Sequence, residues 1–425
     1  MKITHIHIER FRGFQNEDFE VGSLLTAIAG QNGTQKSTLL GIITQTFTLK
    51  TEDSMRVEKP LCGGSYISAF KDKFRLSPTF DKPKGHEWTI SFDAGMDDFT
   101  VESIKRTGDP NVRFWKKGAR QEGDGYISFP TIFLSLKRLV PVAEEAKIIT
   151  DDTLLTQEEL NEFKQLHNKI LIAQTPISSA TTITSKNKQS IGVSTELYDW
   201  NQNSMGQDNL GKIILALFSF KRLHDKYPRQ YKGGILAIDE MDATMYPASQ
   251  VELLKVLRKY ASKLNLQILF TTHSMSLLKA MDDLVQEVTK KEETANQAKI
   301  LYLKKVDDKI AIKQGVNFKG IQLDLNVVAE GNNRKKNRIT AYTEDKENIL
   351  FVKAILKSKA FVLDFVDVTL PCSTLMELVT KRVPAFIYPY SIVILDGDVR
   401  MNKNDLRKIN NADNILILPG KIGRA

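Results

Sequence analysis

The sequence is poor in cysteine and has no long apolar run. Its only two cysteines, Cys62 and Cys372, are far apart and form no Cys-x-x-Cys pair, which argues against a disulfide framework and a cysteine-based zinc site. No apolar run approaches the roughly 18 residues that a membrane-spanning helix requires. The N-terminal stretch "MKITHIHIERFRGF" alternates apolar and polar residues and lacks the apolar centre of a secretion signal. We therefore expect a cytoplasmic protein with no membrane segment.

Neither sign of charge dominates. The chain has 60 Lys and Arg against 51 Asp and Glu, which gives a net charge of +9. Such a mild excess suits simple solubility and also suits a polyanionic partner, and both interpretations stay open. After residue 330 the chain holds 16 basic and 10 acidic residues, so a nucleic-acid partner near that end is compatible with the sequence. The basic run there is Arg334, Lys335, Lys336 and Arg338, which fits either a solvated linker or a phosphate-binding segment.

Strand and helix patterns predict an α/β protein of more than one domain, since 425 residues exceed what one core usually organises. Segments 2–9 and 23–29 predict strands, and 50–130 predicts an antiparallel side sheet with long loops. From residue 131 strands and helices alternate, which is typical of a parallel sheet covered by helices, and 298–314 predicts a closing hairpin. The first domain is therefore expected to hold a mixed sheet beside an antiparallel one.

A helical insertion with a mobile loop is predicted at 151–190. The stretch 151–172 opens with capping residues and continues with helical spacing. The stretch 178–190, "SSATTITSKNKQS", is polar and of low complexity, so we expect a mobile loop there.

Changes in composition predict the domain boundaries. The first domain is expected at 1–315 and a polar, basic linker at 316–338. Strand–helix alternation restarts at 339–425, which predicts a second, smaller, parallel α/β domain. No internal repeat relates the two domains.

The stretch "GQNGTQKST" has the pattern of a loop that binds phosphate. Glycines let backbone N–H groups curl around phosphate oxygens at a helix N-terminus, a lysine reaches the β- and γ-phosphates, and a hydroxyl ligates Mg²⁺. Gln35 stands where the pattern has its second glycine, a position that often requires positive φ. The loop alone fits a nucleotide site or a glycine-rich turn. Its candidate nucleotide-binding residues are Gly30, Asn32, Gly33, Gln35, Lys36, Ser37 and Thr38.

Two later strands end in residues suited to phosphate chemistry. Asp239 and Glu240 follow the apolar strand "GGILAI", where an open α/β sheet places its ligands. Asp239 is expected to hold Mg²⁺ together with Ser37, and Glu240 to deprotonate the attacking water. His273 ends another buried strand and could reach a γ-phosphate, although a lone histidine is more often structural.

A polar turn precedes a helix at "NSMGQDNLGKIILAL". Ser204, Gly206 and Gln207 lie in this turn, which offers free N–H groups to an anion. Taken alone, the turn is better explained as a well-capped helix.

In this order, these motifs resemble the ATP-binding-cassette ATPases of the RecF and SMC group. More closely, the chain resembles the ATPase half of the overcoming-lysogenization-defect (OLD) family of nucleases. The resemblance runs from Met1 to about Gln314. It includes "ITHIHIERFRGF", the Walker A loop at 30–38, the signature "SMGQ", the Walker B strand "ILAIDE", the segment "MDATMYPASQ" and the switch residue His273.

The resemblance implies a dimer, or a higher oligomer, in which two heads sandwich two ATP molecules. It implies that Ser204, Gly206 and Gln207 contact the γ-phosphate bound by the partner head, and that Gln45 is a Q-loop residue. The chain departs from the family at Gln35, in SMGQ where the usual signature is LSGGQ, and in having no long coiled coil. The helix at 151–172 is expected to be a shortened dimerisation insertion.

A second set of acidic residues lies near the C-terminus. Glu344 ends a predicted strand, and Asp396 and Asp398 follow a later one, so the three could hold one or two Mg²⁺ ions. Ordinary acidic loops explain them equally well. OLD proteins carry a C-terminal TOPRIM nuclease domain with a strand-end glutamate and a later Asp-x-Asp, which these residues match. Asp345 and Asn348 depart from the family pattern, and the domain is expected to be abbreviated.

Two functions follow from the resemblance. The first is an ATPase coupled to a Mg²⁺-dependent TOPRIM nuclease that acts on nucleic acid in antiphage defence. The alternative is a regulatory or structural ATPase whose TOPRIM-like domain does not cut and which assembles with a partner effector or a nucleic-acid complex such as a retron. A transporter ATPase fits poorly, because the C-terminal domain would have no use there. Gln35 is expected to permit ATP binding and to make turnover slow.

Overall fold

The chain folds into two compact units, Met1–Leu325 and Asn326–Ala425, and each is described by itself. The structure, a computed structural model, describes residues 1–67, 70–93, 95–105, 112–119, 124–139, 148–151, 154–173, 175–184, 189–330, 339–386, 391–402, 406, 409, 412 and 414–419.

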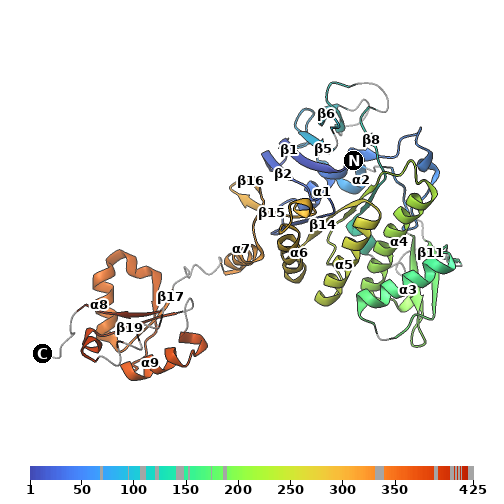
Figure 1. The fold of residues 1–425 in the computed structure, drawn as a ribbon. Helices are drawn as coiled ribbons and strands as arrows, with labels where there is room; N and C mark the ends of the chain where they lie inside the picture. The colour runs from blue at the N-terminus through green and yellow to red at the C-terminus, as the bar shows by residue number, and fades with distance from the viewer. Residues whose placement is uncertain are drawn as a thin grey trace. The chain divides into compact units, whose positions relative to one another are not determined.

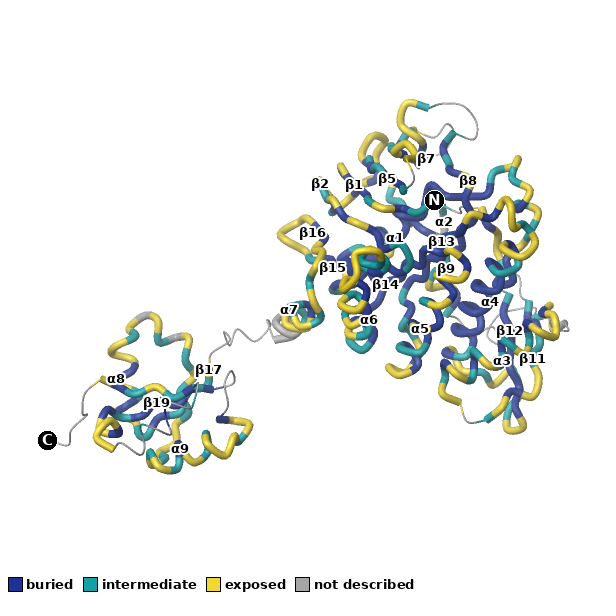
Figure 2. Tube along the Cα trace, viewed as in Figure 1, coloured by how far each residue is buried: buried dark blue, intermediate teal, exposed yellow. Residues whose placement is uncertain are grey.

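A six-stranded mixed sheet forms the centre of the first unit (Figure 1), with the order β16-β15-β3-β14-β13-β9. Its strands are β3 (Leu25–Gly30), β9 (Thr131–Leu134), β13 (Gly234–Ile238), β14 (Leu266–Thr272), β15 (Ala298–Val306) and β16 (Lys309–Lys313). Every pairing is parallel except that of β15 with β16, which is the predicted hairpin. The inner strands β3, β13 and β14 are buried along their whole length (Figure 2), as expected for parallel strands covered on both faces.

Side chains of the central sheet alternate between two hydrophobic clusters, because successive strand residues point to opposite faces. In β13, Leu236 and Ile238 pack in one cluster, and Ile235 and Ala237 pack in the other. The first cluster is covered by the helices α4 (Met205–Lys226), α5 (Pro247–Lys263) and α6 (Met275–Val288). The second is covered by α1 (Lys36–Thr44) and by an antiparallel sheet.

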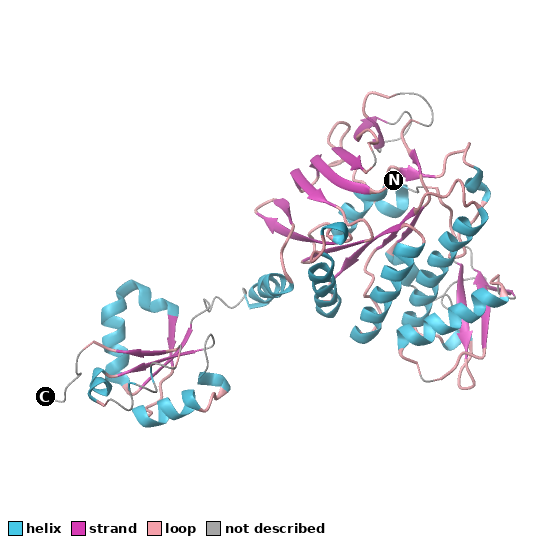
Figure 3. Ribbon diagram, in the orientation of Figure 1, coloured by secondary structure: helices cyan, strands magenta, loops and turns pink. Residues whose placement is uncertain are grey.

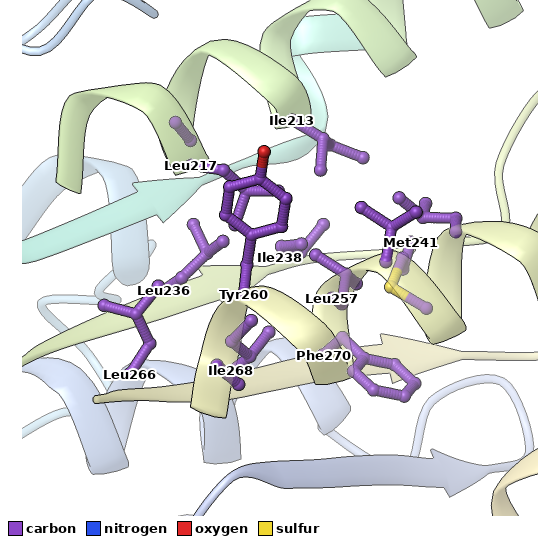
Figure 4. Close-up of a cluster of buried hydrophobic side chains, with 14 of the residues drawn as sticks. Ile213, Leu217, Leu236, Ile238, Met241, Leu257, Tyr260, Leu266, Ile268 and Phe270 are labelled. Carbon is purple, nitrogen blue, oxygen red and sulfur yellow. The ribbon is translucent and has the colours of Figure 1, made fainter. Parts of the chain in front are cut away.

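Figure 4 shows how α4 and α5 meet over the strands β13 and β14. Tyr260 of α5 lies between the strands and the side chains of α4, and its ring is 3% exposed. The labelled side chains are all buried: Ile213, Leu217, Leu236, Ile238, Met241, Leu257, Tyr260, Leu266, Ile268 and Phe270.

The predicted antiparallel side sheet is present and has the strand order β2-β1-β5-β6-β7. Its strands are β1 (Ile3–Phe11), β2 (Phe14–Glu20), β5 (Glu87–Phe92), β6 (Phe99–Lys105) and β7 (Val112–Lys116). The strand β2 was not predicted, because its seven residues are mostly polar; Phe14 and Phe19 are buried, and the rest mostly face outward. Shorter elements before residue 131 include β4 (Phe47–Thr48), a 3₁₀ turn (Ser54–Val57), α2 (Phe70–Lys73) and β8 (Ile127–Ser128).

The insertion contains the predicted helix, but most of the segment predicted as a mobile loop forms strands, and its residues 185–188 lie outside the described residues. The helix α3 (Gln157–Leu171) begins at a capping box between Thr156 and Glu159. The segment predicted as a loop instead forms the strands β11 (Ser179–Thr184) and β12 (Gln189–Ser194), paired with each other and, through β11, with β10 (Ile149–Asp151). Threonine and isoleucine favour strands, and Ile183, Ile191 and Val193 are buried, which outweighs the polar composition.

Part of the predicted linker is helical. The helix α7 (Phe318–Glu330) lies within it, and Ile321 is fully buried in the first unit's core. The Tyr302 hydroxyl and Lys304 both bind Asp324 on the same helix. The first unit therefore extends beyond residue 315. The basic run Arg334, Lys335, Lys336 and Arg338 lies outside the described residues.

The second unit has a four-stranded parallel sheet of order β18-β17-β19-β20, as the alternation predicted (Figure 3). Its elements are β17 (Ile339–Thr343), α8 (Lys346–Leu356), β18 (Leu363–Phe365), α9 (Cys372–Thr380), β19 (Ser391–Leu395) and β20 (Ile415–Ile417). Within the strand–helix alternation predicted at 339–425, most of residues 403–411 lie outside the described residues. Within the described ranges of both units, no helix combines the length and apolar character needed to cross a membrane.

Candidate active site

The loop between β3 and α1 has positive φ angles at three of its residues. Gly30 has φ 152°, Gly33 has φ 80° and Gln35 has φ 61°. A Cβ on Gly30 would lie 2.5 Å from the carbonyl oxygen of Leu303, so only glycine fits there. The loop leads into the N-terminus of α1, where the first backbone N–H groups of a helix are available to an anion.

Gln35 takes the left-handed backbone that the missing glycine would have supplied, with φ 61° and ψ 34° immediately before the first residue of α1. Its side chain lies against the β1–β2 turn, where a Cβ on Gly13 would come within 3.1 Å of Gln35 Nε2. Among the described residues, Gln35 Oε1 is buried without a hydrogen-bond partner. The substitution therefore preserves the loop conformation at a cost in backbone strain and an unsatisfied carbonyl oxygen.

Lys36 is folded into the loop. It is 7% exposed, and its Nζ donates hydrogen bonds to the carbonyl oxygens of Gly30 at 3.1 Å and Gln31 at 3.0 Å. Burial lowers the pKa of Lys36 to about 8, and the carboxylates that follow β13 oppose the decrease. An ammonium held by carbonyl oxygens in a partly dehydrated loop can exchange those contacts for phosphate oxygens.

Ser37 and Asp239 are brought together by the fold. Ser37 Oγ donates to Asp239 Oδ1 at 2.9 Å, and Thr271 Oγ1 donates to the same oxygen at 2.7 Å. Thr271 also accepts a hydrogen bond from the backbone N–H of Glu240 at 2.6 Å. The Ser37 hydroxyl and the Asp239 carboxylate thus meet where the phosphate loop joins α1. Both offer hard oxygen ligands, so these residues fit Mg²⁺.

His273 follows β14 and faces the same site. Partial desolvation and the positive charge of Lys36 lower the pKa of His273, while Asp242, Glu240 and Asp239 oppose the decrease. The imidazole is therefore neutral at pH 7. Asp242 Oδ1 is buried, with no hydrogen-bond partner among the described residues.

The Ser204–Gln207 turn is packed against the segment that follows β13. Ser204 and Gln207 form a capping box at the N-terminus of α4, and Gln207 Nε2 also donates to the Tyr198 hydroxyl at 2.7 Å. A Cβ on Gly206 would lie 2.5 Å from the carbonyl oxygen of Thr244, so this glycine permits the close approach. The turn is thus a well-capped helix start, as its residues alone suggested, and it also touches the segment next to Glu240.

The structure does not bring Gln45 to the phosphate loop. Gln45 is the C-terminal cap of α1 and is 2% exposed. It lies nine positions after Lys36, which corresponds to about 13 Å along a helix. A direct contact of Gln45 with a nucleotide held at Lys36 therefore does not follow from this geometry.

An arginine-rich pocket lies beside the phosphate loop. Arg12, in the β1–β2 turn, donates to Thr38 Oγ1 at 3.4 Å and pairs with the buried Asp81. Hydrogen bonds from Arg12 and from the Ser77 amide outweigh burial and lower the pKa of Asp81 to about 2. The pocket has a volume of about 620 Å³ and is lined by Arg10, Arg12, Gln15, Arg75, Ser77, Phe80, Asp81, Gly85 and His86. This pocket was not predicted from the sequence, although Arg10 and Arg12 belong to the segment "RFRGF".

Three further residues of the site were missed. They are Arg138, whose Nη2 donates to the Glu240 carbonyl oxygen at 2.8 Å, Asn209, which binds Arg138, and Thr271. Arg138 follows β9 in the sequence "LSLKRL", where a basic residue after a buried strand is the only local signal. Asn209 and Thr271 carry no signal that separates them from ordinary helix and strand residues.

Two of the acidic residues of the second unit meet at one edge of its sheet. Because β17 and β19 are parallel neighbours, Glu344 and Asp396 follow adjacent strand ends, and the Asp396 amide donates to Glu344 Oε1 at 2.9 Å. Desolvation, together with the charges of Asp398, Asp396 and Asp345, raises the pKa of Glu344. Asp396 Oδ1 accepts from the Gly397 amide, and Asp398 is exposed.

These acidic residues do not form an assembled metal centre. In the described ranges, no group of three or more His, Cys, Asp or Glu side chains is arranged to hold a metal ion. Asp345 is occupied as the N-terminal cap of α8, where it accepts from the Asn348 amide. The arrangement thus shows the predicted convergence of strand ends but not a metal-ligand geometry.

The chain is similar to several solved structures, at low sequence identity. No curated protein matches the chain. The SMC head domain from Thermotoga maritima is 14% identical over 74% of this chain and 100% of that chain, with a TM-score of 0.41. An SMC head bound to the C-terminal domain of ScpA, derived from Pyrococcus furiosus, is 13% identical over 77% and 99%, with a TM-score of 0.41. The recombination mediator RecF is 11% identical over 74% and 98%, with a TM-score of 0.38.

Because these TM-scores lie below 0.5, the assignment of the site rests on its own geometry and on one family match. Residues 135–278 match the family model of the AAA ATPase domain. The matched segment contains Arg138, Asp239, Glu240 and His273, and it ends within α6. Residues 135–278, about a third of the chain, are therefore similar to the AAA ATPase domain.

Proposed function

We propose that the chain binds and hydrolyses ATP at the site formed by the phosphate loop and the end of β13. The observation that carries the proposal is the 2.9 Å hydrogen bond from Ser37 to Asp239, which joins the first turn of α1 to a carboxylate 202 positions later. A loop lysine, a hydroxyl and a strand-end carboxylate at one place are the groups that P-loop ATPases use for phosphoryl transfer.

Each residue has a proposed role. Lys36 binds the β- and γ-phosphates, and Ser37 with Asp239 would hold Mg²⁺, which neutralises phosphate charge when bound. Glu240 takes the proton of the attacking water. His273, neutral at pH 7, donates a hydrogen bond to the γ-phosphate.

The arginine-rich pocket is proposed to take the adenosine end of the nucleotide. Arg12 connects the pocket to Thr38 in the first turn of α1, the helix that follows the phosphate loop. Phe80, which is 85% exposed, offers an aromatic face at this pocket.

The decisive experiment measures ATP affinity and turnover separately on the full chain. Lys36→Ala is expected to weaken ATP binding more than tenfold. Glu240→Gln is expected to keep the affinity and to lower turnover by about 10²–10⁴-fold, the usual contribution of a general base. Glu293→Gln, an exposed glutamate outside the site, is the matched control and should leave both unchanged. Full turnover in Glu240→Gln would contradict the assignment.

A dimer that closes around ATP is proposed from the surface near Ser204. Leu197, Met205 and Tyr246 are 78%, 43% and 79% exposed, and they flank the contacts among the turn, Tyr198 and Thr244. Exposed apolar groups beside a polar turn fit an interface between copies. Light scattering of Glu240→Gln should show a doubled mass only with ATP and Mg²⁺, and Tyr246→Asp should remain monomeric while still binding ATP.

A second proposal concerns the acidic edge of the second unit. Glu344 and Asp396 at adjacent strand ends, with the pKa of Glu344 raised, favour a role in Mg²⁺-dependent cleavage of nucleic acid. Because the described residues form no ligand set, no reaction step is derived. Cleavage of plasmid DNA or RNA that is lost in Asp398→Ala, with ATP turnover intact, would support it.

Absence of cleavage by an active ATPase would favour the alternative, a non-cleaving unit that controls a partner effector or a nucleic-acid complex. In either case we propose a role in antiphage defence on the family resemblance. Protection of cells against phage plating should then be lost in Lys36→Ala.

A further inference from the structure

Arg138 carries a buried positive charge whose hydrogen bonds go to neutral groups. It lies in a short 3₁₀ turn (Leu136–Leu139) directly after β9 and is 4% exposed. Its Nη1 donates to the carbonyl oxygens of Leu134 at 3.2 Å and Ser135 at 3.1 Å. Burial lowers the pKa of Arg138 to about 10, so the guanidinium is charged at neutral pH. A buried charge is costly, so one that is held by four hydrogen bonds is expected to have a specific task.

The Nη2 of Arg138 holds a strained residue in the candidate active site. It donates to the Glu240 carbonyl oxygen at 2.8 Å, and Glu240 has φ 50°, a left-handed backbone that non-glycine residues rarely adopt. The other side of this residue is held by Thr271, which accepts from the Glu240 amide. Strained backbone persists only where its surroundings fix it on several sides, and here two hydrogen bonds do so.

The Nε of Arg138 reaches the first turns of α4. It donates to Asn209 Oδ1 at 2.7 Å, and Asn209 Nδ2 donates to the Ala243 carbonyl oxygen at 2.9 Å. Asn209 is fully buried and lies one turn after Ser204. One guanidinium therefore contacts both the helix that starts at the Ser204–Gln207 turn and the backbone that aims Glu240.

Gly206 makes a further contact between α4 and the segment that follows β13. Because the Gly206 Cα packs against the Thr244 carbonyl, the first turns of α4 and the segment 240–244 are in contact at two points, Gly206 with Thr244 and Asn209 with Ala243. A displacement of the turn must therefore move this segment, while Arg138 transmits the same displacement to Glu240. Packed contacts of this kind couple sites when an element has two arrangements.

We propose that Arg138 and Asn209 are a positioning pair that couples the Ser204–Gln207 turn to the backbone of Glu240, so that water activation depends on the state of that turn. The expected effect on kcat rests on the ATPase function proposed above. The expected effect on the backbone at 239–245 rests on the contacts alone. Neither residue touches the reacting atoms; both act through the orientation of Glu240.

The kinetic arm compares Arg138→Gln, Arg138→Lys and Asn209→Ala in the full chain. The matched control is Lys137→Gln, which removes the same charge from the exposed neighbour. Arg138→Gln and Asn209→Ala are each expected to lower kcat at least tenfold and to change ATP affinity less than twofold. Arg138→Lys keeps the charge but cannot span the same acceptors, so it should rescue little. The double variant should lose no more than the larger single loss.

The structural arm needs no ATP, which separates failure of this inference from failure of the ATPase function. Amide hydrogen exchange at 239–245 should become at least tenfold faster in both Arg138→Gln and Asn209→Ala, with α5 and α6 unchanged. Unchanged exchange at 239–245 would overturn the coupling even if wild-type ATPase activity is present. Equal losses in Lys137→Gln, or additive losses in the double variant, would also overturn it.

Discussion

At the scale of single residues, Lys36 connects the pH of the solution to nucleotide binding. Its pKa is about 8 in the free protein, well below the ordinary value of 10.5. The polyphosphate of ATP favours the ammonium form, so binding raises the pKa and takes up a proton when the pH is above 8. The part of the ATP affinity that depends on the Lys36 ammonium is therefore present below pH 8 and is lost as the pH rises above 8.

We expect the Kd for ATP to increase about tenfold between pH 7 and pH 9, as the ammonium fraction of the free protein falls. Calorimetry in buffers of different ionisation enthalpy would measure the proton uptake directly. Lys36→Arg keeps its charge throughout this range, so its Kd should be nearly flat with pH whatever its absolute value. A flat profile in the wild-type protein would show that the pKa is not lowered.

The left-handed backbone of Gln35 is expected to lower the free energy of unfolding. A left-handed residue with a side chain costs about 1–2 kcal/mol relative to its usual conformation, a cost that glycine avoids. Both Gln35→Gly and Gln35→Ala remove the buried Oε1, so their comparison isolates the backbone term. We expect the glycine variant to be more stable than the alanine variant by about 1 kcal/mol and to turn over ATP faster. Equal unfolding midpoints in urea would exclude strain as the consequence of this substitution.

At the scale of elements, the N-terminus of α4 depends on one glycine. An alanine at 206 would place its Cβ 2.5 Å from the Thr244 carbonyl oxygen. Either α4 or the segment that follows β13 must therefore shift. We expect Gly206→Ala to lower the free energy of unfolding by about 1–3 kcal/mol, as overpacking usually does, and to lower ATP turnover.

Gly211 of the same helix, α4, provides the control for Gly206. A Cβ on Gly211 would meet its nearest neighbour, the Ile191 carbonyl oxygen, at 3.4 Å, an ordinary contact. Gly211→Ala should therefore be neutral or should stabilise α4 by up to about 1 kcal/mol through helix propensity. Urea unfolding of both variants, with equal slopes, would measure the difference, and similar values for the two would remove the special role of Gly206.

At the scale of the whole molecule, each unit has hydrophobic clusters of its own. Among the described residues, the buried members of the first unit's clusters run to Ile321, and those of the second unit's clusters begin at Ala341. Units with their own cores are expected to unfold in separate transitions.

ATP at 100 times its Kd should stabilise only the first unit, by about 2.7 kcal/mol, because the proposed ATP site lies in that unit. Scanning calorimetry should therefore show one transition that shifts with ATP and one that does not. In Lys36→Ala neither should shift. A single cooperative transition, or a shift in both, would show that the two units are energetically coupled.

Local sequence patterns predicted most of the strands and helices and the residues of a candidate phosphate loop. Apolar periodicity is local, and so are the glycine spacing of 30–37 and the strand that delivers Asp239 and Glu240. The same local logic missed the strands β11 and β12, where the burial of Ile183 in β11 and of Ile191 in β12 outweighs a polar composition.

Contacts between distant segments of the folded chain determine which residues act together. The contacts of Arg138 with Asn209 and Glu240 join positions 71 and 102 apart, and no local pattern marks them. The same holds for Ser37 with Asp239, which two motifs suggested but only the parallel pairing of β3, β14 and β13 brings into contact. Sheet order is set by which apolar faces bury one another across the whole unit, and a sequence pattern records the face of each strand but not its neighbour.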